Sequence, residues 1–308
     1  MTDTHQHSSA SPTVTSADRQ TQIGLAAMPF LFVLIWSTGF IAAKYGLPYA
    51  PPLTFLLLRF LGVVVVLLPL VLLMRAPWPV GLTGHIAVAG VLVQAGYLAG
   101  VWCAIKLGMP AGLSALIVGM QPVLTAFAAP LIGESVRGRQ WLGLALGLSG
   151  VALVVANKVS LIGLTYESIA WCVLALFSIT IGTLYQKRFC PKFDLRSGTL
   201  IQFVASIVVV LPLAWWLEDW TPAFAAVQWT PEFVGALLWS VLALSIGAIF
   251  LLFALIRRSA ATTVTSLLYL TPPTTAIMAW LMFGETFSLT GALGMLLAVA
   301  GVAFVVRK

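Results

Sequence analysis

The sequence predicts an all-α integral membrane protein in which ten transmembrane helices form two inverted five-helix repeats. Three observations lead to this fold class. Hydrophobic residues make up 60% of the 308 positions and charged residues only 8%, whereas about a quarter of residues are charged in an average soluble domain. Apolar runs long enough to span a bilayer recur along the chain. The second half also repeats landmarks of the first half at a fixed spacing.

Ten apolar runs approach the roughly 20 residues that a spanning helix needs, and short polar or Pro/Gly segments separate them. The runs cover residues 25–44, 53–73, 85–105, 111–132, 141–157, 166–186, 198–217, 233–256, 261–283 and 290–306. The segment 1–24 is rich in Ser, Thr, His and Gln and lacks the pattern of a cleaved signal peptide. It is therefore predicted to be a disordered cytoplasmic tail.

The positions of the basic residues favour cytoplasmic termini. If the N-terminus lies inside, twelve of the sixteen Lys and Arg residues fall in cytoplasmic segments, whereas only Lys44, Lys106 and Lys158 fall in outer loops. Such a bias follows the positive-inside rule. The net charge of +7 is thus a topology feature and implies no nucleic-acid partner. We expect a multi-pass protein of the cell (inner) membrane, and the sequence does not specify its oligomeric state.

An internal repeat relates the two halves of the chain. Residues 111–157 align without a gap to residues 262–308, and the alignment matches Pro, Gly-Glu and Gly landmarks. It pairs Pro122 with Pro273, Gly133-Glu134 with Gly284-Glu285, and Gly143 and Gly150 with Gly294 and Gly301. The two repeats then cover 25–158 and 163–308. Because five is odd, the second repeat must cross the membrane in the opposite sense, a plan that places transporter substrate sites near the midplane.

Together these landmarks resemble a known family. The elements are Trp36-Ser37, Gly39-Phe40 and Lys44 in the first run, then Lys106-Leu107-Gly108, Gln121-Pro122, Gly133-Glu134 and the glycine-containing fifth run, with a second copy after Ala254. This pattern is similar to EamA-type members of the drug/metabolite transporter superfamily and covers essentially everything after the tail. The resemblance implies export of amino acids, other metabolites or drugs. In the second copy, Phe177-Ser178 replaces the opening Trp-Ser, so no role is transferred to those residues.

Proline residues at repeat-related positions interrupt the fourth and the ninth apolar runs. Pro122 cannot donate a hydrogen bond to the carbonyl of Val118, and Pro272 and Pro273 interrupt the ninth run in the same way. In lipid a freed carbonyl needs another partner, so such breaks favour positions that face protein or a wet cavity. These three residues are candidates for helix breaks that take part in gating. The alternative is a kink that only shapes packing.

Uncharged polar residues on three runs are candidates for a substrate-binding surface. They are Gln94 and Tyr97 on the third run, Ser114, Gln121 and Thr125 on the fourth, and Thr265 and Tyr269 on the ninth. Spacings of three, four and seven residues place neighbours on one helix face. These groups either line a cavity or form interhelical hydrogen bonds, which contribute only about 0.6 kcal/mol each on average.

Arg59 is the only charged residue clearly within a predicted span. It either extends toward the outer headgroups, as Lys44 is expected to do, or faces inward as the anchor for a substrate carboxylate, for which a planar guanidinium is suited. Glu134 and Glu285 stand at run ends and are expected to be caps rather than ligands.

Catalytic and metal-binding patterns do not occur in the sequence. All nine acidic residues fall in the tail, in loops or near helix ends, and the three cysteines have no ligand spacing. We therefore expect no enzyme activity, metal or cofactor, and no proton relay through a mid-membrane carboxylate. The predicted function is a secondary transporter that exports small metabolites or amino acids by alternating access, with a small-molecule substrate and the lipid bilayer as partners. The alternatives are an integral-membrane enzyme acting on a lipid-linked substrate and a non-transporting membrane scaffold.

Overall fold

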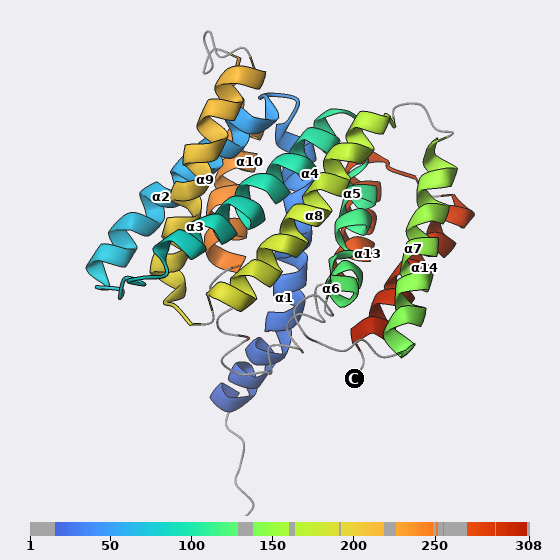
Figure 1. Ribbon diagram of the computed structural model, residues 1–308, viewed down its shortest axis with the longest axis horizontal. Coiled ribbons are helices and arrows are strands. Elements are labelled where there is room, and N and C mark those ends of the chain that lie inside the picture. Colours follow the sequence, from blue (N-terminus) through green and yellow to red (C-terminus); the bar gives the residue numbers. More distant parts are fainter. Residues whose placement is uncertain are drawn as a thin grey trace, which may run out of the picture.

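The computed structural model describes residues 16–128, 138–159, 164–190, 192–218, 226–248, 251, 255, 270–286 and 288–306. Their regular structure is helical throughout (Figure 1). Five helical stretches are long and apolar enough to cross a membrane: Ala27–Gly46, Pro52–Leu73, Thr83–Lys106, Tyr166–Phe189 and Leu195–Leu217. The other predicted runs also contain described helix.

The first half of the chain contains α1 (Ser16–Gly46), α2 (Pro52–Leu73), α3 (Thr83–Gly90), the π-helix η1 (Val91–Gly96), α4 (Tyr97–Lys106), α5 (Ala111–Val118), α6 (Gln121–Ala128) and α7 (Gly138–Val159). The second half contains α8 (Tyr166–Phe189), α9 (Leu195–Leu217), α10 (Pro231–Leu238), the π-helix η3 (Trp239–Gly247), α13 (Thr271–Phe283) and α14 (Leu289–Val306). The helix α1 starts inside the predicted tail, because the Ala, Arg and Gln residues that follow Ser16 favour helix and extend it beyond its apolar part.

Helices of the two halves pack against each other rather than forming separate bundles. α2 packs against α9, α5 against α13, and α7 against α14. In addition, α1 packs against α10, η3 and α13, while α8 packs against α4, η1, α5 and α6. Figure 1 shows α7 and α14 side by side at one edge of the molecule. One large cluster of buried apolar side chains runs through both halves, so neither half has a core of its own.

Glycines allow α7 and α14 to approach closely. A Cβ placed on Gly150 would collide with the backbone of Gly294 and Ala298, and one placed on Gly301 would lie 2.5 Å from the carbonyl oxygen of Gly143. Small residues at helix crossings permit such backbone contact in membranes. The glycines that the sequence repeat matches to each other thus make the contact between these two helices.

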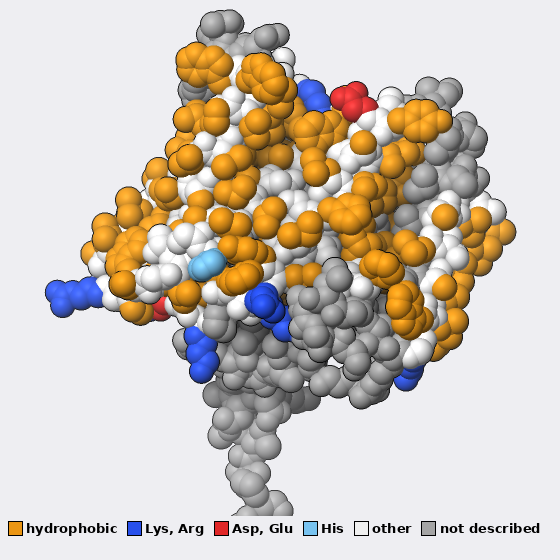
Figure 2. Space-filling view, viewed as in Figure 1, with side chains coloured by type: hydrophobic (Ala, Val, Ile, Leu, Met, Phe, Trp, Pro, Cys, Tyr) orange, Lys and Arg blue, Asp and Glu red, His pale blue; other side chains and the backbone are white. Residues whose placement is uncertain are grey.

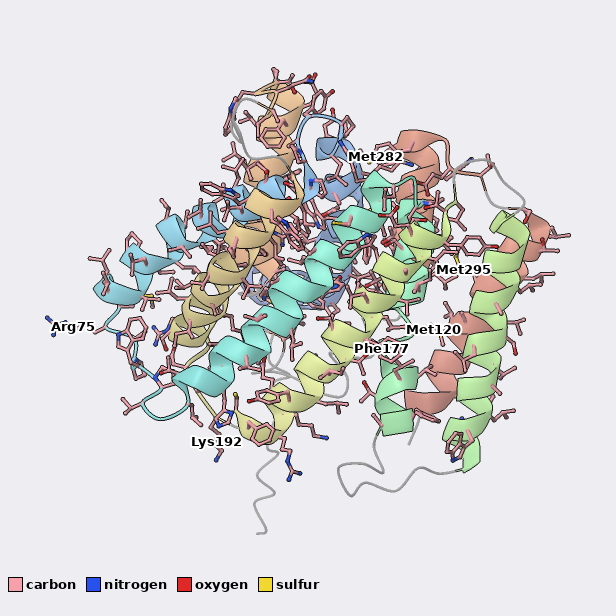
Figure 3. All side chains as sticks on the ribbon, turned by 45° about the horizontal axis from the view of Figure 1, so that its top comes forward. Arg75, Met120, Phe177, Lys192, Met282 and Met295 are labelled. Carbon is pink, nitrogen blue, oxygen red and sulfur yellow. The ribbon has the colours of Figure 1, made fainter. Side chains whose placement is uncertain are left out.

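The outer surface is apolar, as expected for side chains that face lipid. Hydrophobic side chains cover most of the described surface in Figure 2. Among the exposed ones are Val65 and Val208, which lie near the middle of α2 and α9. In Figure 3, Arg75 and Lys192 project at one end of the bundle, whereas Met282 lies at the opposite end.

Side-chain caps start three helices of the second half. Thr165 and Ser168 form a capping box at α8, and Thr230 accepts a hydrogen bond from the Phe233 amide at α10. Asp194 caps α9 and also pairs with Arg196, whose Nη2 donates to its Oδ2 at 2.7 Å. These hydrogen bonds from Arg196 lower the pKa of Asp194 below its ordinary value, so the cap remains charged at neutral pH.

Candidate functional site

Two π-helical segments mark equivalent positions in the two halves. The 151-residue spacing that relates Pro122 to Pro273 places η1 on residues 242–247, which lie inside η3. The same spacing pairs Gln94 with Ser245. Segments of π-helix within longer helices occur frequently at functional sites. Gln94 was predicted from the sequence but Ser245 was not, because a single serine in an apolar run carries little information.

Arg59 is buried and points toward η3. Its side chain is 6% exposed, and its Nε and Nη2 groups donate hydrogen bonds to Ser245 Oγ at 3.2 and 3.1 Å. Rings of Phe55 and Phe233 pack together near the starts of α2 and α10, so both helices begin at the same end of the bundle. At about 1.5 Å per residue, Ser245 lies roughly 20 Å from the start of α10. The guanidinium is therefore directed along the bundle, away from the end at which α2 and α10 begin.

The charge of Arg59 has no acidic partner among the described residues, since no described carboxylate lies within 4.0 Å of it. Ser245 is a neutral acceptor, and its own hydroxyl donates to the carbonyl oxygen of Ser240 at 3.0 Å. The i to i−5 spacing of this last hydrogen bond matches the π-helical geometry of η3. The π-helix η3 thus fixes the position of Ser245 Oγ, which accepts the hydrogen bonds from Arg59.

Two other predicted residues are buried on α4 and α5. Tyr97 lies on α4, which packs against α2, the helix that carries Arg59, and against α8. Ser114 lies on α5, and its Oγ is 3.5 Å from the sulfur of Cys172 on α8. Because α5 also packs against α4, Arg59, Tyr97 and Ser114 lie on neighbouring helices.

Three further hydroxyl groups are buried without a hydrogen-bond partner in the described part of the chain. They belong to Ser37 on α1, Ser240 on η3 and Thr271 on α13. α1 packs against both η3 and α13, and Thr275 on α13 donates to the Ser37 carbonyl oxygen at 3.3 Å. An unsatisfied buried polar group is costly and needs an explanation. From the sequence, Ser37 was named only as part of the pair Trp36-Ser37, and Ser240 and Thr271 were not predicted.

Other predicted residues make structural hydrogen bonds or lie outside the described part. Gln121 Nε2 donates to Thr183 Oγ1 on α8 at 3.2 Å, and Thr125 donates to the Gln121 carbonyl oxygen at 2.8 Å. The Gln121 bond is of the interhelical kind considered as the alternative, whereas the Thr125 bond lies within α6. Gln94 is partly buried in η1. Thr265 and Tyr269 lie outside the described residues.

The helix breaks at the prolines meet in the structure. α5 ends at Val118 and α6 begins at Gln121, so Pro122 occupies the first turn of α6, where its missing N–H costs nothing. Pro272 and Pro273 likewise stand in the first turn of α13. A Cβ on Gly119, in the break, would lie 2.7 Å from Pro272 Cγ. Met120, labelled in Figure 3, packs from the same break onto Gly147 of α7.

One end of the bundle is closed by polar contacts between the halves, here called the latch. Glu285 accepts hydrogen bonds from the amides of Ala111 and Gly112 at 3.0 and 3.4 Å, and it forms an ion pair with Lys44. Glu285 is therefore a helix cap, as its place in the sequence suggests. For Lys44, the structure adds a partner that the sequence did not indicate, because its ammonium group pairs with the Glu285 carboxylate. Glu134 lies outside the described residues.

Glu218 makes the second contact of the latch. It follows α9 and accepts hydrogen bonds from the amides of Leu53 and Thr54, at 2.6 and 2.8 Å, and from the Thr54 hydroxyl at 2.7 Å. Lys106 also donates to the Leu47 carbonyl oxygen at 2.6 Å. Two acidic residues of the second half thus hold the N-termini of two helices of the first half, where the helix dipole favours a negative charge.

Comparison with known proteins identifies the family. The model of the EamA-like transporter family matches residues 22–156 and again residues 167–307, so the chain belongs to this family. Both matches coincide with the two halves described above. The chain is a multi-pass membrane protein of a transporter family.

Individual relatives agree with this assignment. The chain is 28% identical to "Uncharacterized transporter YvbV" of Bacillus subtilis, over 90% of this chain and 89% of that protein. It is 26% identical to the "Probable amino-acid metabolite efflux pump" of Escherichia coli K12, over 60% of each chain. A solved structure titled "Crystal structure of protein" has a TM-score of 0.62 and 18% identity, and the match covers 92% of this chain and 96% of that one. This last likeness supports the fold.

Proposed function

We propose that the protein is a secondary transporter that exports small metabolites or amino acids across the inner membrane by alternating access. The observation that carries this proposal is the buried Arg59 of the first half, whose guanidinium donates hydrogen bonds to Ser245 of the second half. The name of the Escherichia coli relative, an amino-acid metabolite efflux pump, supports amino acids or related compounds as substrates.

The proposed architecture is ten spans in two inverted repeats. Three described contacts support it, because each joins equivalent positions of the two halves. The repeat pairs Gly150 with Gly301 and Gly143 with Gly294. In the structure, Gly150 lies against Gly294, and Gly301 lies against Gly143. The breaks before Pro122 and Pro273 lie against each other. η1 packs against α9 as η3 packs against α2.

The proposed substrate surface combines the predicted residues with those that the structure adds. Arg59, Tyr97 and Ser114 form its centre together with Ser245 and the unpaired hydroxyls. Gln94, Gln121, Thr125, Thr265 and Tyr269 are proposed to join it when the helices rearrange, and Pro122, Pro272 and Pro273 are proposed to be the points where the helices bend. In this scheme the latch closes the outer end, and both termini are cytoplasmic.

A comparison of growth media tests the proposed function. Metabolites are measured in the medium around cells that overexpress the protein, cells that lack it and cells in which it is restored. We expect one compound or a small group of compounds to accumulate outside in proportion to expression. A newly formed product in place of a redistributed one would indicate the enzyme alternative, and no difference in any compound would favour the scaffold.

A further inference from the structure

Arg59 is a buried cation that uses only part of its hydrogen-bonding capacity. A guanidinium carries five N–H donors in one plane, and the described contacts of Arg59 are two hydrogen bonds to a single oxygen, Ser245 Oγ. Buried charges in proteins are normally paired with an opposite charge. The partner that the described residues do not provide can be supplied by the transported compound.

We infer that the transported compounds carry one carboxylate, which binds the free edge of the Arg59 guanidinium. This inference rests on the proposed transport function and names its substrate class. Ser245 binds Nε and Nη2, which leaves the edge formed by Nη1 and Nη2. Two parallel hydrogen bonds from such an edge match the two oxygens of a carboxylate. Ser245 therefore positions Arg59 so that this edge is presented.

The surroundings favour a single negative charge rather than a phosphate or a dicarboxylate. Lys44 and Lys106, the described lysines at the latch, are held by Glu285 and by the Leu47 carbonyl oxygen. Arg59-Phe60 and residues 65–70 match Gln202-Phe203 and residues 208–213 at a second spacing, 143 residues, so Gln202 stands at the position equivalent to Arg59. The Gln202 amide donates to Gln186 Oε1 at 3.0 Å. The residue at the equivalent position is thus uncharged, so Arg59 is the one cation that the described residues provide to the site.

The unpaired hydroxyls indicate what else the compound carries. Ser37, Ser240 and Thr271 are buried and can each donate or accept a hydrogen bond. Small polar groups near a carboxylate, such as the ammonium of an amino acid or the hydroxyl of a hydroxy acid, would satisfy them. Small amino and hydroxy monocarboxylic acids therefore form the substrate class.

The test uses purified full-length protein in liposomes. Uptake is measured for labelled L-alanine, L-leucine, L-phenylalanine and lactate, and for the carboxamide of each, which lacks the negative charge. The proteins are wild type, Arg59→Lys, Arg59→Gln and the control Arg75→Gln, which removes the same charge from an exposed position after α2. Thermal unfolding of each variant checks that it is folded.

We expect wild type and Arg75→Gln to transport acids in preference to their carboxamides. Arg59→Lys keeps the charge but loses the planar fork, so its half-saturation concentration for acids should rise severalfold to tens-fold. Arg59→Gln should lose the preference for acids. Comparison of acids with carboxamides on wild type alone decides the inference even if the variants do not fold.

Three results would overturn the inference while leaving transport intact. The first is equal wild-type uptake of acids and carboxamides, and the second is an unchanged preference in Arg59→Gln. The third is export of a compound in cells without uptake of any acid in the panel. If the wild type moves no compound in cells or liposomes, the proposed function itself fails.

Discussion

The Lys44–Glu285 ion pair is predicted to control how often the latched end of the bundle opens. Glu285→Gln is the informative change, because the amide has the shape of the carboxylate and still offers one oxygen to the amides of Ala111 and Gly112. It removes the negative charge that pairs with Lys44 and that interacts favourably with the dipole at the N-terminus of α5. The closed state should therefore lose stability without a loss of packing.

The size of the effect follows from the contacts. Exposed ion pairs contribute about 0.2–1 kcal/mol, and this pair falls toward the upper end because the side chain of Glu285 is only 7% exposed, although that of Lys44 is 31% exposed. A negative charge at a helix N-terminus contributes about 0.3–1 kcal/mol more. A total loss of about 1–2 kcal/mol makes opening roughly five- to thirtyfold more frequent, at about 1.4 kcal/mol per factor of ten.

Chemical labelling of a residue behind the latch measures this opening. Ser114 is fully buried on α5, and Ser114→Cys in a background without Cys103, Cys172 and Cys190 provides a single reporter. A charged maleimide that cannot cross the membrane is added to intact cells and, separately, to inside-out vesicles. From the outer side, labelling should be about five to thirty times faster with Glu285→Gln.

A matched control and a double variant make this prediction refutable. Glu232→Gln makes the same chemical change at an exposed residue in the first turn of α10 and should leave the labelling rate unchanged. Lys44→Gln should speed labelling, and adding it to Glu285→Gln should have little further effect because the pair is already broken. If labelling is no faster with Glu285→Gln from either side, the ion pair does not hold this end closed.

Three further predictions follow from the structure. Gly301→Ala should destabilise the protein by about 1–3 kcal/mol, because the added methyl overlaps the α7 backbone; Gly138→Ala, with open space around it, should not lower the thermal unfolding temperature. Asp194→Ala should cost about 1 kcal/mol at pH 7 through loss of the α9 cap. Because the folded-state pKa of Asp194 is lowered, this charge-dependent stability is present above the ordinary pKa and is lost as the pH falls through the folded value, so wild type and Asp194→Asn should converge in acid. Reporter fusions at residue 308 and in the loop 218–232 should report opposite sides of the membrane, and agreement between them would contradict the ten-span topology.

The helical membrane fold could be predicted from the sequence because its physical causes are local. Long apolar runs specify helices that lipid can surround, and a repeated pattern of Pro and Gly specifies related halves. Both are visible without knowing any contact. The structure adds the finer geometry, such as the start of α1 at Ser16 and the turn at Gly119 and Met120 that divides α5 from α6. A proline in the first turn of a helix indicates that a break lies nearby, but it does not define the residue at which the preceding helix ends.

The candidate site was less predictable, because it depends on pairs of residues far apart in the chain. The cost of a buried charge singled out Arg59, but its contact with Ser245 spans 186 residues, and no local pattern indicates it. The apolar sequence around Lys44 suggested snorkelling, whereas a carboxylate 241 residues away binds it. Thr125 donates to the Gln121 carbonyl oxygen, and the Gln121 side chain donates to α8. Spacing on one helix face cannot distinguish such structural hydrogen bonds from contacts with a substrate.

The helices α1 and α13 connect the proposed site with the latch. Lys44 lies at the end of α1 and Glu285 just after α13, while the unpaired hydroxyls of Ser37 and Thr271 lie farther along these helices. A ligand can shift a conformational equilibrium only if it binds the two states with different affinity. A compound that binds Arg59 on α2 and these hydroxyls must hold α1 and α13 at a fixed separation. That separation also sets whether Lys44 reaches Glu285, so occupation of the site and closure of this end are expected to depend on each other.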